Sequence, residues 1–224
     1  MSGGSGPGGA PRPVPAPDKT PTTVVAPDGE QGVEHPGTGT LGVQIFCAGL
    51  AFLFFASLIG YLWIRFQTDP WPPEGVKPLP WGMVVSTAVL AGCSAGIQWA
   101  LVRIRKGDQK GLRGGLAFAF TLAFGFLIAQ SINWYLWLPA DILDRRTATY
   151  VPERNPYTVF FVVLTGLHAL HILGGLIPLG VVMRNAFKGK YTWAFYPGVK
   201  QSAIYWHFLG VIWLILYAVL FITG

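Results

Sequence analysis

Residues 155–183 read NPYTVFFVVLTGLHALHILGGLIPLGVVM and contain no Asp, Glu, Lys or Arg. A helix needs about 20 apolar residues to cross the hydrocarbon core of a bilayer, so this stretch is long enough. Four further charge-free stretches lie before and after it, at residues 41–64, 78–102, 114–140 and 201–224. The five stretches together predict a protein that crosses a membrane five times.

Helices are the only secondary structure that fits these stretches. Lipid offers no hydrogen-bond partner to the backbone, so a spanning segment must be a helix or belong to a closed barrel. Barrel strands have about 10 residues and alternate apolar with polar side chains, whereas these stretches are apolar on all sides. We predict an all-α polytopic membrane protein, a bundle of five transmembrane helices with a disordered N-terminal tail. The membrane domain would span residues 41–224, with helices at about 41–65, 79–103, 113–138, 157–183 and 201–223.

The composition agrees with this class of protein. Of the 224 residues, 52% are hydrophobic and 12% are charged, about half of the roughly 25% charged residues of a soluble domain. Residues 1–40 are rich in Pro and Gly and nearly free of apolar side chains, so we expect a disordered cytoplasmic tail. The formal net charge of +6 does not indicate nucleic-acid binding, because the basic residues lie between apolar blocks and form no basic face.

The Lys and Arg residues between the stretches predict the orientation, because cytoplasmic loops carry the excess of positive charge. One side would carry eleven basic residues, including the run from Arg103 to Arg113, and the other side five, including Arg65. We therefore expect the N-terminus in the cytoplasm and the C-terminus outside. Five tryptophans near the connections fit an interfacial aromatic belt and need no binding role, namely Trp63, Trp71, Trp81, Trp134 and Trp137.

Small residues four apart predict close contacts between helices, because packing replaces the hydrophobic driving force in lipid. Such pairs are Ala56 with Gly60, Gly92 with Gly96, and Gly111 with Gly115. The two cysteines, Cys47 and Cys93, lie inside apolar stretches, where a thiol behaves as a small hydrophobic group. A disulfide between them across two helices stays open.

Polar side chains inside the spanning stretches are the first place to look for function. They include Gln98, Gln130, Asn133, Thr165, His168, His171 and His207. Imidazole is a common metal ligand, so the three histidines raise the hypothesis of a haem or metal site. Against it, the stretches hold no acidic residue to orient a ligating imidazole, and His168 and His171 lie one turn apart on one helix. We favour structural, hydrogen-bonded histidines.

Other activities fit the sequence less well. A proton relay needs a chain of titratable groups, and these stretches contain no carboxylate. Intramembrane serines such as Ser94, Ser131 and Ser202 have no accompanying motif that would indicate a hydrolase. A small transporter or channel would need paired polar residues along a hydrated pore, for which intramembrane charge is too scarce.

Two motifs resemble those of a known family. Residues 165–175, TGLHALHILGG, resemble the TGxHxxHxxxG helix of haem-copper oxidase subunit III. Residues 205–208, YWHF, followed by Trp213, resemble the signature of the last helix in that family. Residues 86–100 and Gln130 match in the same order, so that the resemblance runs from about residue 41 to the end of the chain.

The resemblance implies a five-helix subunit III of the bacterial type, in a plasma membrane oxidase that couples electron transport to proton pumping. It implies a non-catalytic subunit without haem or copper of its own, both of which are expected in partner subunits. The expected partners are oxidase subunit I, subunit II of the same complex, and phospholipids, whereas cytochrome c or quinol would react at other subunits. The residues expected to bond helices or lipid headgroups are Gln130, Asn133, Thr165, His168, His171 and His207.

Two alternatives stay open at this point. One is a subunit of a quinol oxidase or nitric oxide reductase of the same family, and the other is a stand-alone membrane protein that binds haem or metal through its histidines. The sequence also departs from the family at Leu50, Asn133 and Gly210, where family members commonly carry carboxylates. A role that depends on a buried titratable acid is therefore not expected, whereas packing and lipid binding are unaffected.

Overall fold

The computed structural model describes residues 23–25, 31–33, 38–71, 78–137, 143–144, 149–150 and 156–223. The chain divides into two compact units, Met1–Thr38 and Gly39–Gly224. In the first unit, strands β1 (Thr23–Val25) and β2 (Gln31–Val33) pair antiparallel. Most of the tail predicted to be disordered, residues 1–40, lies outside the described residues.

The second unit is a bundle of membrane-spanning helices. The part of the chain that the structure describes contains 5 helices long and apolar enough to cross a membrane, which confirms the predicted fold class. They are α1 (Thr38–Gln67), α2 (Gly82–Arg105), α3 (Gln109–Trp137), α4 (Pro156–Phe187) and α5 (Pro197–Thr223). Between α3 and α4, strands β3 (Leu143–Asp144) and β4 (Thr149–Tyr150) form a short antiparallel pair that the sequence did not predict.

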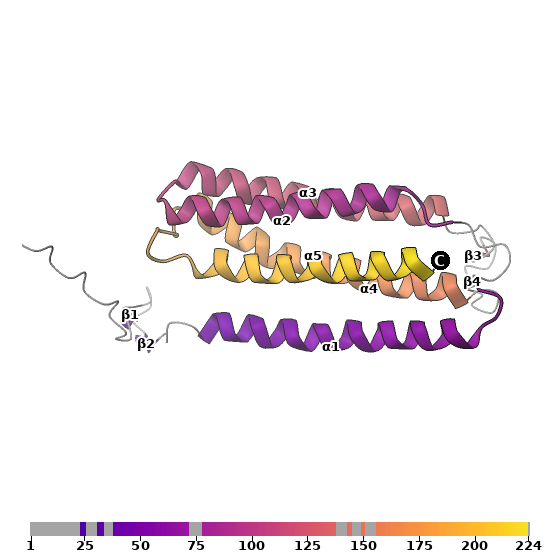
Figure 1. Ribbon diagram of the computed structural model, residues 1–224. Helices are drawn as coiled ribbons and strands as arrows, with labels where there is room; N and C mark the ends of the chain where they lie inside the picture. The colour runs from indigo at the N-terminus through magenta and orange to yellow at the C-terminus, as the bar shows by residue number, and fades with distance from the viewer. Residues whose placement is uncertain are drawn as a thin grey trace, which may run out of the picture. The chain divides into compact units, whose positions relative to one another are not determined.

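Successive helices run in opposite directions and lie side by side (Figure 1). Helix α2 packs along both α3 and α5, and α4 completes the circuit by packing along α3 and α5. Helix α1 joins these four through its side chains. The ring of Tyr61 meets Phe160 of α4 with 5.8 Å between ring centroids, and its hydroxyl is hydrogen-bonded to Thr223 of α5.

The contact between α2 and α3 depends on two glycines. A Cβ atom at Gly115 would lie 2.9 Å from the carbonyl oxygen of Gly96 and 2.9 Å from the backbone nitrogen of Ala100. A Cβ atom at Gly96 would lie 3.3 Å from the carbonyl oxygen of Gly115. A side chain at Gly115 would therefore push the helices apart. Gly96 and Gly115 each belong to one of the pairs of small residues named above, and the two helices approach each other closely where these glycines meet.

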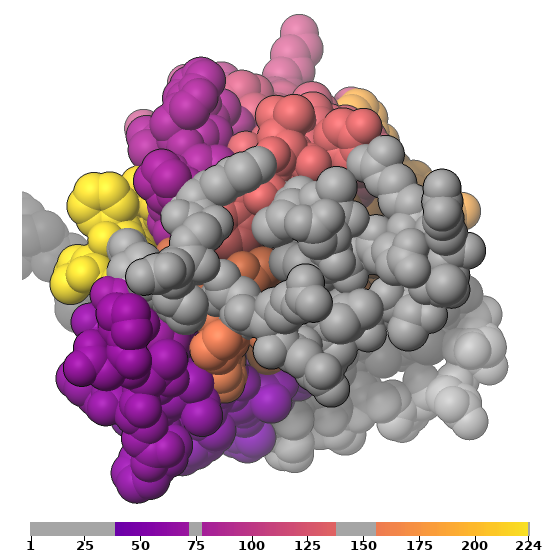
Figure 2. All heavy atoms as spheres, turned by 90° about the vertical axis from the view of Figure 1, so that its right-hand side faces the viewer, coloured from indigo at the N-terminus to yellow at the C-terminus, as the bar shows by residue number. Residues whose placement is uncertain are grey.

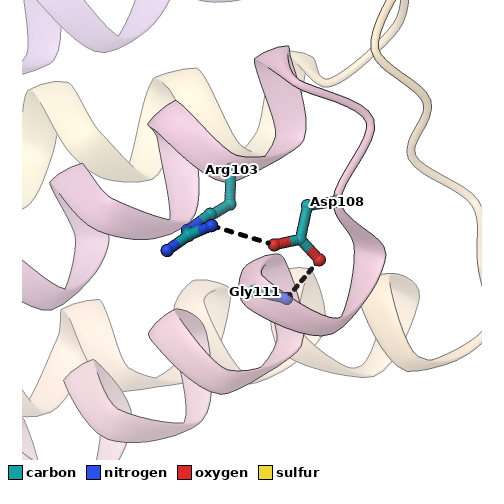
Figure 3. Close-up of polar contacts among 3 residues, drawn as sticks. All are labelled: Arg103, Asp108 and Gly111. Carbon is teal, nitrogen blue, oxygen red and sulfur yellow. Dashed lines mark hydrogen bonds and ion pairs between the residues drawn. The ribbon is translucent and has the colours of Figure 1, made fainter.

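A tight turn joins α2 to α3 at the basic end of the bundle. Gly107, with φ of 74°, follows the end of α2, and the N–H groups of Gly107 and Asp108 bond to carbonyls of the last turn. Glycine suits this position because the left-handed conformation costs it little. Asp108 then caps α3, since its carboxylate accepts a 2.9 Å hydrogen bond from the N–H of Gly111 and pairs with Arg103 at 3.4 Å (Figure 3). The turn thereby fixes where α3 begins.

At the opposite end, α1 holds the carboxyl end of α5. The indole N–H of Trp71 donates to the carbonyl of Thr223 at 2.7 Å, while Tyr61 bonds to the hydroxyl of the same residue. The guanidinium of Arg65 lies over the Trp71 ring, 5.4 Å from its centroid. Figure 2 shows the yellow end of α5 beside the purple end of α1.

The tryptophans differ in part from the expected interfacial belt. Trp63 and Trp81 are exposed, as such a belt requires. Trp134 and Trp137 instead point inward, and their N–H groups donate to the Thr165 hydroxyl and the Pro78 carbonyl, each at 3.0 Å. A buried indole must find an acceptor, so these side chains, with Trp71, connect separate segments of the bundle. Cys47 and Cys93 are both buried free thiols, so the disulfide that the sequence left open is not formed.

Candidate functional site within the membrane bundle

Several polar side chains of the bundle interior form separate pairs, and each pair connects two helices. The amide of Asn133 on α3 donates to the hydroxyl of Ser86 on α2 at 3.0 Å. Thr165 on α4 accepts from Trp134 and donates to the Phe161 carbonyl of its own helix at 2.6 Å. Hydrogen bonds between helices in lipid stabilise by about 0.6 kcal/mol each on average, so several are needed to hold such a bundle.

A further pair connects the last helix to the second. The indole N–H of Trp213 on α5 donates to the hydroxyl of Thr87 on α2 at 2.9 Å. The same indole ring lies against the imidazole of His168, with 5.0 Å between centroids. Trp213 is therefore shared between a hydrogen bond and an aromatic cluster at the centre of the bundle.

His168 is fully buried among aromatic rings. Its imidazole is surrounded by Phe54 of α1, Phe126 of α3 and Trp213 of α5, with centroid distances of 6.1, 5.8 and 5.0 Å. Neither of its ring nitrogens has a hydrogen-bond partner among the described residues. His168 thus acts in this arrangement as a core side chain on which three other helices converge.

Gln130 is the second buried polar side chain without a hydrogen bond among the described residues, since neither its amide oxygen nor its nitrogen is paired. It lies on the buried face of α3, one turn from Phe126 and one turn from Trp134. Phe126 contacts His168, and Trp134 bonds to Thr165, so Gln130 faces the same part of α4 as they do. An unpaired buried amide costs about 1–3 kcal/mol, which makes this position a weak point of the core.

His171 lies at the boundary between the core and a hollow. Its Nδ1–H donates to the carbonyl of Leu167 at 2.7 Å, since a carbonyl oxygen can only accept. Its own carbonyl accepts a 2.9 Å hydrogen bond from the hydroxyl of Tyr205 on α5. Phe54 of α1 packs against the imidazole with 5.3 Å between centroids. His171 therefore helps to hold α4 between α1 and α5.

His207 lies on the outer side of the contact between α2 and α5. Its Nε2 is 3.3 Å from the amide oxygen of Gln98, an acceptor, so the imidazole donates in this pair. Gln98 is exposed and His207 is half-buried. This is a hydrogen bond between helices at the surface of the bundle, in contrast to the interior pairs.

The three histidines do not converge on one point. The Nδ1 atom of His171 is bonded to its own helix, His207 is bonded to Gln98, and His168 is enclosed by aromatic rings. Within the described ranges, no group of three His, Cys, Asp or Glu side chains is arranged to hold a metal ion. The geometry does not favour the stand-alone haem- or metal-binding alternative.

Two hollows lie between α1 and the helices next to it. One, of about 570 Å³, is lined almost entirely by carbon atoms of α1 and α5, including Phe52, Phe55 and Ile215. The other, of about 380 Å³, lies between α1, α4 and α5 and includes the polar side chains of His171, Gln201 and Tyr205. Gln201 stands one turn from the start of α5, so the second hollow extends toward the end of the bundle where the basic residues gather.

That end carries most of the positive charge of the described chain. The carboxyl ends of α2 and α4 meet the starts of α3 and α5 there, held by hydrogen bonds from Gln109 to the Tyr191 carbonyl and from Arg113 to the Ala186 carbonyl. Burial raises the pKa of the Tyr191 phenol, and a hydrogen bond with Asn185 opposes that rise. The basic side chains are Arg103, Arg105, Lys106, Lys110, Arg113, Arg184, Lys188, Lys190 and Lys200.

Sequence reasoning named six site residues, and the structure distributes them over three environments. Asn133 and Thr165 bond across helices, Gln130 and His168 are enclosed in the core, and His171 and His207 lie beside hollows. The partners Ser86, Thr87 and Trp213 were missed. Ser86 bonds to the amide of Asn133, and Thr87 bonds to the indole of Trp213. Nothing in the local sequence indicates which side chain meets which across a helix contact.

Comparison with known proteins adds an independent finding. Residues 39–224 match the profile of the family described as cytochrome c oxidase subunit III. A cytochrome c oxidase subunit 3 of Thermostichus vulcanus is 32% identical over 190 residues, covering 84% of this chain and 89% of the relative. The Synechocystis sp. protein of the same name is 28% identical, covering 84% and 77%. That of Gallus gallus is 29% identical, covering 82% and 69%.

Proposed function

The chain belongs to the cytochrome c oxidase subunit III family, and from this premise we propose that it is a structural subunit that carries out no catalytic step itself. The match to residues 39–224 is the observation that carries the proposal, because it includes all five spanning helices. As a subunit III of a haem-copper oxidase, the protein is part of a respiratory complex in a membrane. All three relatives carry the cytochrome c oxidase name, so the quinol oxidase and nitric oxide reductase alternatives are not favoured.

A structural role agrees with how the polar side chains are used. The side chains of Asn133, Thr165 and His207 each form a hydrogen bond to a side chain of a neighbouring helix. His171 contributes its backbone carbonyl, which accepts from Tyr205 of α5, while its imidazole bonds within α4. Gln130 and His168 would serve as interior packing residues between α3 and the helices around it. None of the five spanning stretches contains a carboxylate, so a proton-carrying acid would have to come from another subunit.

The redox chemistry would then belong to neighbouring subunits. We expect this chain to pack on oxidase subunit I, in a complex that also contains subunit II, and the haem and copper to be bound there. Cytochrome c would deliver electrons at those subunits. The chain would contribute packing surface and durability to the complex.

The distribution of charge supports an orientation in a bacterial plasma membrane. Nine Lys and Arg side chains lie at one end of the bundle, and Asp108 is the only acidic residue that the structure describes there. Arg65 and Asp69 lie at the other end, and the remaining basic residues of that side are outside the described residues. By the positive-inside rule the basic end, with the start of α1, faces the cytoplasm and α5 ends outside.

Phospholipid is the ligand that suits the two hollows beside α1. The larger hollow offers carbon-lined walls to an acyl chain, and the smaller one offers His171, Gln201 and Tyr205 to a polar group. Lys200 stands next to Gln201 and adds a positive charge that would attract an anionic headgroup. Filling the larger hollow with Ala51→Trp should lower the phospholipid retained per chain after detergent purification, measured by mass spectrometry. Gly114→Trp, at an exposed position with nothing within 4 Å of an added Cβ, is the control.

Purification through an affinity tag on this chain tests the function itself. In mild detergent, the chain should bring oxidase subunits and a stoichiometric haem absorption band with it, whereas the chain expressed alone should show no such band. A Soret band from the isolated chain would mean that it binds haem itself. Recovery of the chain without any oxidase subunit would refute the proposal.

A further inference from the structure

The outer side of the contact between α2 and α5 carries hydrogen-bonding groups at a depth where lipid has none. His207 stands ten residues after the start of α5 at Pro197, about 15 Å along the helix axis. Gln98 stands seven residues before the end of α2 at Arg105, about 10 Å from it. Since the hydrocarbon core is about 30 Å thick, this pair lies inside it.

A hollow lies directly beside the pair. It has a volume of about 260 Å³, and its walls include Thr87, Ser94, His207, Gly210 and Val211. Gly210 forms the floor, because a Cβ atom there would already stand 3.2 Å from the hydroxyl oxygen of Ser94. We call this surface, made by Thr87, Ser94, Gln98, His207, Gly210 and Val211, the α2–α5 groove.

The hydrogen-bonding capacity of the groove exceeds what its own pair uses. The bond to His207 engages the amide oxygen of Gln98 and leaves its two N–H donors available. The Nδ1 atom of His207, an acceptor when Nε2 carries the proton, is likewise not used by this bond. Acyl chains cannot satisfy such groups, and lipid headgroups and water lie at the membrane surface. A protein side chain is the partner that supplies hydrogen bonds at this depth.

Another outer face of the bundle, on α3, provides a contrast. There the hollow on α3 is lined by Leu127, Ile128, Ser131, Ile132 and Tyr135. Its mid-helix hydroxyl, that of Ser131, is satisfied within α3 by a 2.8 Å hydrogen bond to the carbonyl of Leu127. That face therefore suits lipid, whereas the α2–α5 groove does not.

We propose that the α2–α5 groove is the surface on which a transmembrane helix of another oxidase subunit docks, with a polar side chain of that helix bonded to Gln98 and His207. The inference rests on the proposed function, since it names the face that the complex uses. The exposed alanines at positions 91 and 95 along the rim allow the docking helix to approach closely.

Two substitutions of matched exposure test the groove in the tagged complex. Val211 is 55% exposed in the groove, and Leu173 is 53% exposed on α4. Leu173 shares a helix face with Gly166 and Gly180, where an added Cβ would lie 3.9 Å from Trp134 and 3.5 Å from Phe120 of α3. Val211→Trp should lower the haem recovered per tagged chain by about tenfold, because overpacking at a docked interface is costly. Leu173→Trp should leave it unchanged.

The double variant Gln98→Leu with His207→Leu removes the hydrogen bonds without adding volume, and it should also lower haem recovery. A photo-crosslinking amino acid at position 211 in the assembled complex gives a readout that does not depend on the stability of a variant. It should form an adduct with another oxidase subunit. Membrane levels of each variant, measured by immunoblot, normalise the recovery.

Three results would overturn the inference. They are full haem recovery with Val211→Trp, equal loss with Leu173→Trp, and adducts at position 211 that contain only phospholipid. If the unmodified chain itself recovers no oxidase subunit, the proposed function has failed, and that result is seen before any variant is made.

Discussion

Gly115→Ala should separate α2 from α3 and destabilise the bundle. The added Cβ would lie 2.9 Å from the Gly96 carbonyl oxygen and from the Ala100 nitrogen, both backbone atoms that cannot rotate away. Restoring ordinary contact distances requires a local separation of about 0.5 Å, which forfeits about a quarter of the dispersion energy of the atoms involved. Overpacking of this kind costs about 1–3 kcal/mol.

The adjacent glycine supplies the control. Gly114 is exposed and has nothing within 4 Å of an added Cβ, so Gly114→Ala tests helix propensity alone. Replacing Gly by Ala in a helix gains about 1 kcal/mol, and both variants receive that gain. The free energy of unfolding, measured by circular dichroism of the chain in mixed micelles of increasing SDS content, should therefore be about 2 kcal/mol lower for Gly115→Ala than for Gly114→Ala. Equal values would refute the packing argument.

Three further comparisons between pairs of variants test the polar contacts. Asn133→Leu should lower the free energy of unfolding by about 1 kcal/mol, because it removes the hydrogen bond from the Asn133 amide to the Ser86 hydroxyl. Gln130→Leu should leave the free energy of unfolding unchanged or raise it, since neither amide atom of Gln130 is paired among the described residues. The same SDS titration compares the two variants. Tyr61→Phe should speed proteolytic removal of a C-terminal tag by freeing the end of α5, and Tyr135→Phe, at an exposed ring, should not. His207→Ala should reduce the amount of this chain in the purified complex relative to His171→Ala, because His171 bonds to its own helix; unchanged stoichiometry for His207→Ala would contradict its role.

The number of helices could be predicted from sequence because a charge inside hydrocarbon is expensive. Stretches without Asp, Glu, Lys or Arg therefore mark the spans directly. The helix ends could not be placed by the same rule. Helix α2 continues through Arg103 and Arg105, and α4 through Arg184, because cations are favourable in the last turn of a helix. Glycines with positive φ, Gly107 and Gly189, end these helices instead.

The polar residues could be identified from sequence, but their partners could not. His168 and His171 stand three positions apart, yet one is enclosed by Phe54, Phe126 and Trp213 and the other reaches a hollow. The two histidines differ because α4 contacts several other helices. Which helix lies against each histidine depends on how distant segments of the chain pack. The hydrogen bond between Trp213 and Thr87 could not be predicted for the same reason, since the two residues lie far apart in the chain.

The three positions where family members commonly carry carboxylates show how a bundle without buried acids is held together. Leu50 is buried in α1, Asn133 bonds to Ser86, and Gly210 forms the floor of the α2–α5 groove. A carboxylate at any of these positions would have to be paired or protonated, because lipid does not solvate charge. Because the residues at these positions are neutral, their burial does not require a proton to be bound there. Leu50, Asn133 and Gly210 therefore cannot carry a proton for the complex, and what these three positions contribute is packing.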